Sequence, residues 1–296
     1  MISSEWFRST DLWVMGPARF HCATDSLQFL YTFLYFLKHC AAALYLPKVD
    51  WLVVLDADTS VVNPNHCFEE WIDDRVDLVF YQRFMNWEIM SANYIVRNSD
   101  FSINFLNGWA NYEFLVNETF NHAYDNGAIH LHVLRAVLPD AHEEIAACED
   151  IYAQSKNFEE YFGYVTCVHS FLGATRIWPR KLRIHRRAHG FARDGFLTNH
   201  RFCDYDFLFH GYKGNYTDMD YLPFKKFNVS QCGQGMSGWN YRKDSKTSVE
   251  EIRLDLEAFE NASGKDYPKQ ARVNPHLDRS DVGRCYPNCD RFTDMR

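Results

Sequence analysis

Short apolar runs rich in Val, Leu and Phe alternate along the chain with longer stretches in which apolar residues recur every three or four positions. The short runs predict buried strands, and the longer stretches predict helices with one face in the core. Strands are predicted at residues 52–55, 77–81, 94–97, 176–178 and 206–209. Helices are predicted at residues 27–37, 66–74, 100–115, 128–137, 143–155, 157–172 and 249–259.

Two of the predicted helices carry unusual apolar surfaces. Residues 27–37 form an apolar, aromatic run that stops at Lys38 and His39. A membrane-spanning helix needs about 20 apolar residues, so this run predicts a buried helix instead. Phe101, Phe105 and Trp109 follow one another at helical spacing. This aromatic stripe is more typical of a core than of a ligand platform.

Strands that alternate with helices predict an α/β fold, with a mainly parallel sheet flanked by helices on both faces. The pattern changes at about Gly214, where the chain becomes polar and rich in turns. We therefore expect residues 1–213 to form the main domain and residues 214–296 to form a polar extension that packs on it.

Composition narrows the class of protein. The chain has 296 residues, of which 47% are hydrophobic and 17% aromatic, so it has enough apolar material for a large core. The formal net charge is −8, which gives no basic footprint for nucleic acid. Residues 180–187 form one basic cluster, which we expect to face solvent or an anionic substrate group.

The cysteines favour an oxidising compartment with some disulfides. The chain has nine cysteines. It has no Cys-x-x-Cys pair, and Cys285 and Cys289 have no second pair with which to form a zinc site. The alternative is a set of scattered buried thiols. Sequons for N-glycosylation occur at Asn117, Asn215, Asn228 and Asn261. Residues 1–16 lack the apolar core of a signal peptide. If the protein works in the secretory pathway, its signal or anchor is therefore expected outside this chain.

The predicted strand at 52–55 ends abruptly in Asp56 and Asp58. Ligands of α/β proteins bind at the carboxyl ends of strands, and carboxylates suit Mg²⁺ or Mn²⁺ and the phosphates that these ions carry. An Asp-rich turn after a strand is the alternative, since Asp-x-Asp alone is common.

Two further segments place polar groups at the ends of apolar runs. His210, Gly211 and Lys213 follow the strand predicted at 206–209, where His210 could complete a cation site and Lys213 could neutralise a phosphate. A structural histidine is the alternative. Asp125 and Asn126 open a predicted helix, where an aspartate is also a good N-cap.

Four segments together resemble the motifs of GT-A glycosyltransferases, most closely the galactosyl- and mannosyltransferases of the Golgi type. The segments are WLVVLDADTSVVNP at 51–64, SANYIVRN at 91–98, DNGA at 125–128 and FHGYK at 209–213. In the last one the glycine follows His210 directly, whereas the motif that it resembles has two residues between them. The chain is still more similar to a nematode-expanded family of unassigned function grouped with these transferases, through FYQRFMNWEI, YDNGAIH, ARDGFLTN and DFLFHGYK. The resemblance covers residues 35–260.

The resemblance implies a metal-dependent hexosyltransferase that uses a nucleotide sugar of the UDP or GDP type. It implies that Asp56 and Asp58 hold Mn²⁺ or Mg²⁺ and meet the nucleotide sugar, with His210 as the third protein ligand. Lys213 would stabilise the departing diphosphate with the metal, and Gly211 would allow close approach of the backbone.

On the sugar and acceptor side, the resemblance implies roles for Asn93, Asp125 and Asn126. The acceptor would be a glycan or a glycoprotein, and transfer would retain the anomeric configuration. The expected location is the Golgi lumen or the exterior of the cell, with contact to a membrane only through an anchor that this chain does not contain. Only 55 residues precede Asp56, so the nucleotide-binding half is expected to be short.

Two competing interpretations remain open. Asp56 and Asp58 after an apolar strand also resemble the haloacid-dehalogenase phosphatases, but the late Gly-Asp…Asp pair of that family is missing: residues 73–74 lie in a predicted helix, and residues 193–195 read as a turn. The other interpretation is an inactive transferase-like protein of the secretory pathway that binds carbohydrate or acts as a scaffold.

Overall fold

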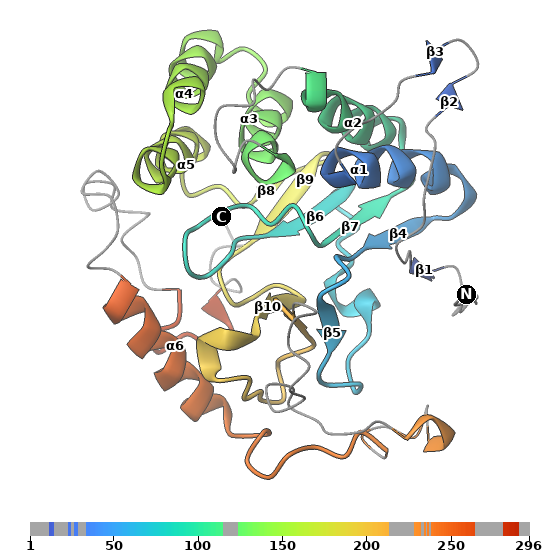
Figure 1. Cartoon of the computed structure of the whole chain (residues 1–296), viewed down its shortest axis with the longest axis vertical. Helices are drawn as coiled ribbons and strands as arrows, with labels where there is room; N and C mark the ends of the chain where they lie inside the picture. The colour runs from blue at the N-terminus through green and yellow to red at the C-terminus, as the bar shows by residue number, and fades with distance from the viewer. Residues whose placement is uncertain are drawn as a thin grey trace.

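The computed structural model describes residues 34–114, 124–212, 228–231, 234, 236, 238–263 and 281–289, together with the backbone of three short strands nearer the N-terminus. Within these residues the chain forms a six-stranded central sheet, a layer of five α-helices and a three-stranded sheet (Figure 1). The fold is therefore a mixed α/β fold, as the alternation of strand and helix patterns predicts.

The central sheet has the strand order β1-β4-β7-β6-β9-β8. Its strands are β1 (Leu12–Val14), β4 (Trp51–Val54), β6 (Leu78–Tyr81), β7 (Tyr94–Arg97), β8 (Ile177–Trp178) and β9 (Leu182–His185). The pairs β1–β4 and β6–β9 are parallel, whereas β7 runs antiparallel to both β4 and β6, and β8 antiparallel to β9. The prediction of a mainly parallel sheet is not confirmed. The chain passes from β6 to β7 without a crossover helix, and a parallel pair would require one.

Five helices lie on one side of the central sheet (Figure 1), and one of them, α4, packs on α3 and α5. The five are α1 (Leu34–Tyr45), α2 (Asp100–Ala110), α3 (Asp125–Val137), α4 (His142–Gln154) and α5 (Phe158–Leu172). Alternate strand residues such as Leu52, Val54 and Phe80 join Trp109 of the predicted aromatic stripe in the larger core. That stripe is therefore core, as predicted. The sequence predicted helices on both faces of the sheet. For α1 to α5 this prediction is wrong, because all five lie on the same side.

The opposite face of the sheet is covered by shorter elements. Val53, Val79 and Tyr81 pack there with Phe191 and Phe207. The covering elements are the 3-10 helix η2 (Phe68–Trp71) and the three-stranded sheet of β10 (Ala192–Asp194), β11 (Leu208–His210) and β5 (Thr59–Val61). The helix predicted at 66–74 is thus a single 3-10 turn.

Arginines thought to lie in turns or on the surface are buried in these layers. Residues 193–195 were expected as a turn, but Arg193 lies in β10, where it bonds Asp206 at 2.6 and 2.9 Å. Part of the basic cluster 180–187 forms β9, and Arg187 is 3% exposed and pairs with Asp281. The expectation that this cluster faces solvent or a substrate is therefore wrong for Arg187.

The remaining described elements are short or C-terminal. They are β2 (Ala23–Thr24), β3 (Leu27–Gln28), η1 (Leu46–Lys48), η3 (Asn111–Phe114), η4 (Gly195–Thr198), η6 (Val229–Gln231) and α6 (Val249–Ser263). Of the helix predicted at 27–37, Leu27 lies instead in β3, whereas residues 34–37 lie in α1. Helix α6 packs on η4 through Ile252, Leu256 and Leu197.

Disulfides indicate an oxidising compartment, as predicted from the cysteine count. Cys148 is bonded to Cys167, and Cys285 to Cys289. Cys40 is disulfide-bonded as well. These bonds fit a secreted or luminal protein. In the described part of the chain, no helix has the length and apolar character needed to cross a membrane.

Candidate metal centre

Strand β4 carries Asp56 to the end of the central sheet. The amide of Asp56 donates to the Oδ1 atom of Asn93 at 2.9 Å, and the hydroxyl of Thr59 donates to the same atom at 3.0 Å. The side-chain amide of Asn93 in turn donates to the hydroxyl of Tyr81 at 3.0 Å. Asn93 is fully buried, so its side chain shapes the Asp-x-Asp turn and reaches a ligand only through that turn.

The three-stranded sheet brings His210 to this turn from a distant part of the chain. In the pairing of β11, His210 lies opposite Thr59 on one side and Asp194 on the other. The amides of Gly211 and Tyr212 both donate to the carbonyl of Asp58, at 3.1 and 3.0 Å. Gly211 has a φ of 102°, a conformation that favours glycine, so it allows the chain to turn sharply at this point.

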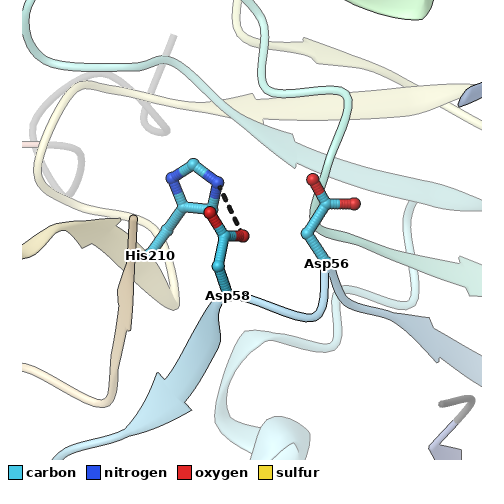
Figure 2. Close-up of side chains that lie close together, drawn as sticks. All are labelled: Asp56, Asp58 and His210. Atoms are coloured by element: carbon cyan, nitrogen blue, oxygen red, sulfur yellow. Dashed lines mark ion pairs between the residues drawn. The ribbon is translucent and has the colours of Figure 1, made fainter. Parts of the chain in front are cut away.

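Asp56, Asp58 and His210 form a cluster in which one ligand atom from each lies within 4.8 Å of the others. Figure 2 shows the three side chains projecting to the same side, with the Nε2 atom of His210 3.3 Å from a carboxylate oxygen of Asp58. All three are partly buried. Two carboxylates and one imidazole form a donor set that fits Mn²⁺, whereas Mg²⁺ prefers oxygen alone.

Asp194 contacts His210 on the side of the ring that faces away from the cluster. This residue was not predicted from the sequence. Its Oδ1 atom accepts a hydrogen bond from Nδ1 of His210 at 2.8 Å, which leaves Nε2 facing the cluster. Histidine ligands of metals usually donate their other ring nitrogen to a carboxylate in this way. The hydrogen bond between Asp194 and His210 is therefore a second feature, beyond the three side chains of the cluster, that is typical of a metal site. Sequence spacing gave no signal for it, because residues 193–195 read as a turn.

Asp194 is itself charged in spite of its burial. The side chain is 3% exposed, and Arg83 donates to its Oδ1 atom at 3.1 Å. Burial raises the pKa of Asp194, but Arg83 and the hydrogen bond from His210 lower it by more, to about 2. A full negative charge is thus fixed behind the imidazole at neutral pH.

A second charged group adjoins the cluster from the helical layer. The ammonium of Lys38 in α1 lies 3.2 Å from Oδ1 of Asp56 and 2.8 Å from Oδ2 of Asp125 in α3. Asp125 is also 3.3 Å from Nε2 of His39. Burial lowers the pKa of Lys38, but Asp125 and Asp56 raise it above its ordinary value, so the ammonium stays charged.

Asp125 is a buried member of this group and not a helix cap. Its side chain is 1% exposed, and the N-cap position of α3 belongs to Tyr124. Burial raises the pKa of Asp125, but Lys38 and His39 lower it to about 2. The interpretation of Asp125 as an N-cap is therefore wrong, and its ion pair with Lys38 brings it beside the cluster of Asp56, Asp58 and His210.

Asn126 and Lys213 complete the predicted site residues. The side-chain oxygen of Asn126 accepts a short hydrogen bond from the hydroxyl of Ser91, and its carbonyl accepts bonds from His130 and Tyr161. Lys213 lies outside the described residues. The structure thus brings together four of the predicted site residues. Three of them form the cluster of Asp56, Asp58 and His210, and Lys38 links Asp56 to the fourth, Asp125. Asn126 follows Asp125 on α3.

Comparison with known families adds a single match. A family model described as a protein of unknown function, DUF273, matches residues 10–223, which include every residue of the cluster. No curated protein and no solved structure matches the chain.

Proposed function

The chain belongs to the DUF273 family, and we propose that it is a metal-dependent glycosyltransferase with a GT-A fold. In this proposal it moves a hexose from a nucleotide sugar of the UDP or GDP type to a glycan or glycoprotein, with retention of configuration. The disulfides support a place of action in the Golgi lumen or outside the cell.

The observation that carries the proposal is the cluster of Asp56, Asp58 and His210 at the end of a buried strand. A Mn²⁺ or Mg²⁺ ion bound there would supply positive charge to the diphosphate as it leaves the sugar. The two carboxylates are separated by one residue. Four hydrogen bonds, two to Oδ1 of Asn93 and two to the carbonyl of Asp58, fix the turn that holds them. A preformed site of this kind needs little reorganisation on binding.

The neighbouring residues have roles that follow from their positions. His210 presents Nε2 to the cluster because Asp194 engages Nδ1. Lys38 brings a cation to the edge of the cluster, where a diphosphate would meet it. Asn126, at the start of α3 and only partly buried, is proposed to offer its side-chain amide to the sugar and acceptor. Asp125 is buried, and its proposed influence on that side of the site is through its ion pair with Lys38. Lys213, three residues after His210, is proposed to contact the diphosphate.

Calorimetric titration with UDP and GDP, with and without Mn²⁺, tests the proposal. We expect one of the two nucleotides to bind only when Mn²⁺ is present. Asp58→Asn removes one ligand charge with almost no change in shape, so it should abolish metal-dependent binding. Asp140→Asn is the matched control, because Asp140 is exposed and follows the C-terminal end of α3, whereas Asp125 and Asn126 lie at its N-terminal end.

The same titration separates the active enzyme from the alternative. A folded protein that binds neither nucleotide in the presence of Mn²⁺ would contradict the transferase. That result would favour a carbohydrate-binding or scaffold protein that has lost its donor site.

A further inference from the structure

Lys38 occupies an unusual position between two acidic groups. Its ammonium lies 3.2 Å from Asp56, a proposed metal ligand, and 2.8 Å from Asp125, which belongs to the neighbouring group. Lys38 therefore supplies positive charge to the carboxylate that a metal would bind. The side chain is 21% exposed, so water screens this interaction only in part.

The partner of Lys38 on the other side is held rigidly. Asp125 is 1% exposed, and His39 contacts the same Oδ2 atom that Lys38 does. The ring of His39 stacks on Trp109 with 3.5 Å between centroids and bonds the hydroxyl of Tyr94 at 3.0 Å. Because Asp125 is fixed in the core, its ion pair keeps Lys38 beside the proposed metal site even if Lys38 moves away from Asp56.

A divalent ion at Asp56 would therefore face a like charge at short range. Repulsion between charges a few ångströms apart is strong in a partly buried site. An anion bound to the ion would be attracted by both positive charges and would reduce the repulsion between them. Binding of the metal and binding of an anion should consequently support each other at this site.

We propose that Lys38 is an internal counter-cation that competes with the metal for Asp56 and makes tight metal binding depend on a diphosphate ligand. This inference rests on the proposed metal site. It assigns to Lys38 the role of making the affinity for the ion depend on whether a diphosphate is bound. Lys38 acts on the metal through charge, so its replacement should strengthen binding of the ion alone. A residue that merely maintains the fold would have the opposite effect.

The test is a titration of the whole chain with Mn²⁺, followed by the electron paramagnetic resonance signal of the free ion. It is made without nucleotide, with UDP and with GDP. Lys38→Met keeps the length of the side chain and removes its charge, and Lys38→Arg is the matched control that retains the charge. We expect Lys38→Met to bind Mn²⁺ alone about tenfold more tightly than the wild type, which corresponds to about 1.4 kcal/mol.

The nucleotide arm gives a second readout. UDP or GDP should tighten Mn²⁺ binding in the wild type and in Lys38→Arg, and the gain should be smaller in Lys38→Met. Should Lys38→Met leave Asp125 unpaired and fail to fold, the double variant Lys38→Met with Asp125→Asn removes both charges. It should also bind Mn²⁺ alone more tightly, because Lys38 lies directly against Asp56.

The failures of the two proposals differ. If the wild type binds Mn²⁺ and the folded variants that lack the Lys38 charge bind it equally or more weakly, the counter-cation is overturned and the metal site stands. If the wild type and all variants leave Mn²⁺ free with either nucleotide, the metal site is overturned, and the inference with it.

Discussion

The imidazole of His210 donates from Nδ1 to the buried carboxylate of Asp194 at 2.8 Å. This bond fixes the orientation of the ring, so that Nε2 points to Asp58 at the end of the central sheet. Asp194 acts on a metal only through His210, which makes it a positioning residue of the site.

Asp194→Asn is expected to weaken Mn²⁺ binding by about 10- to 100-fold, the usual cost of losing such a partner. The asparagine amide can donate to Nδ1, which would place the ring proton on Nε2 and remove the lone pair that binds the ion. The measurement is a Mn²⁺ titration with UDP or GDP. Asp73→Asn is a matched control, since Asp73 is also paired with arginines, Arg75 and Arg183. Equal Mn²⁺ affinity in the Asp194→Asn variant and the control would contradict the role of Asp194.

Asp125 should contribute to the acid sensitivity of folding. Its pKa is about 2 in the folded protein against an ordinary value of 3.8. A depressed pKa stabilises the fold above the unfolded value, and the contribution is lost as the pH falls from about 3.8 to about 2. The loss is about 2 kcal/mol. Urea unfolding across this range should show a steeper fall for the wild type than for Asp125→Asn, and parallel curves would refute the assignment.

Three buried histidines should lower the stability of the fold at a higher pH than Asp125 does. Burial lowers the pKa of His39, His130 and His132 from 6.5 to about 4. The unfolded chain therefore binds more protons than the folded chain between these values, so stability falls as the pH drops from 6.5 to 4. Each histidine contributes up to about 1.4 kcal/mol per pH unit. Unfolding free energies that stay constant over this range would show that the three side chains titrate normally.

The disulfide between Cys148 and Cys167 should stabilise the helical layer, because it joins α4 to α5. Its cysteines are 19 residues apart, and a closed loop of that size is worth about 3 kcal/mol. Replacing both cysteines with serine should lower the free energy of unfolding by that amount. Cys67→Ser, which removes an exposed free thiol, should leave it unchanged.

Sequence reasoning was most successful where the pattern is local. The strand predicted at 94–97 is β7, and the predicted helices at 143–155 and 157–172 are α4 and α5 within one residue at each end. Apolar spacing in these segments reports directly on which face is buried. The arrangement of the sheet is not local, because the direction of β7 depends on how the chain returns from β6.

The candidate site shows the same division. The resemblance placed Asp56, Asp58 and His210 together, and the structure brings their ligand atoms within 4.8 Å. Asp194 and Lys38 were not foreseen. Asp194 reaches His210 only through the register of β10 on β11, and Lys38 reaches Asp56 only because α1 packs beside the end of β4. Neither relationship leaves a pattern in the neighbouring sequence.

The proposed activity requires that Asp56, Asp58 and His210 bind a divalent ion. Diffraction from crystals grown with MnCl₂ and UDP or GDP, recorded at the manganese absorption edge, tests it most directly. We expect one strong anomalous peak in contact with Asp56, Asp58 and Nε2 of His210, with nucleotide phosphate beside it. No peak between these side chains, or a peak only at other acidic residues, would contradict it.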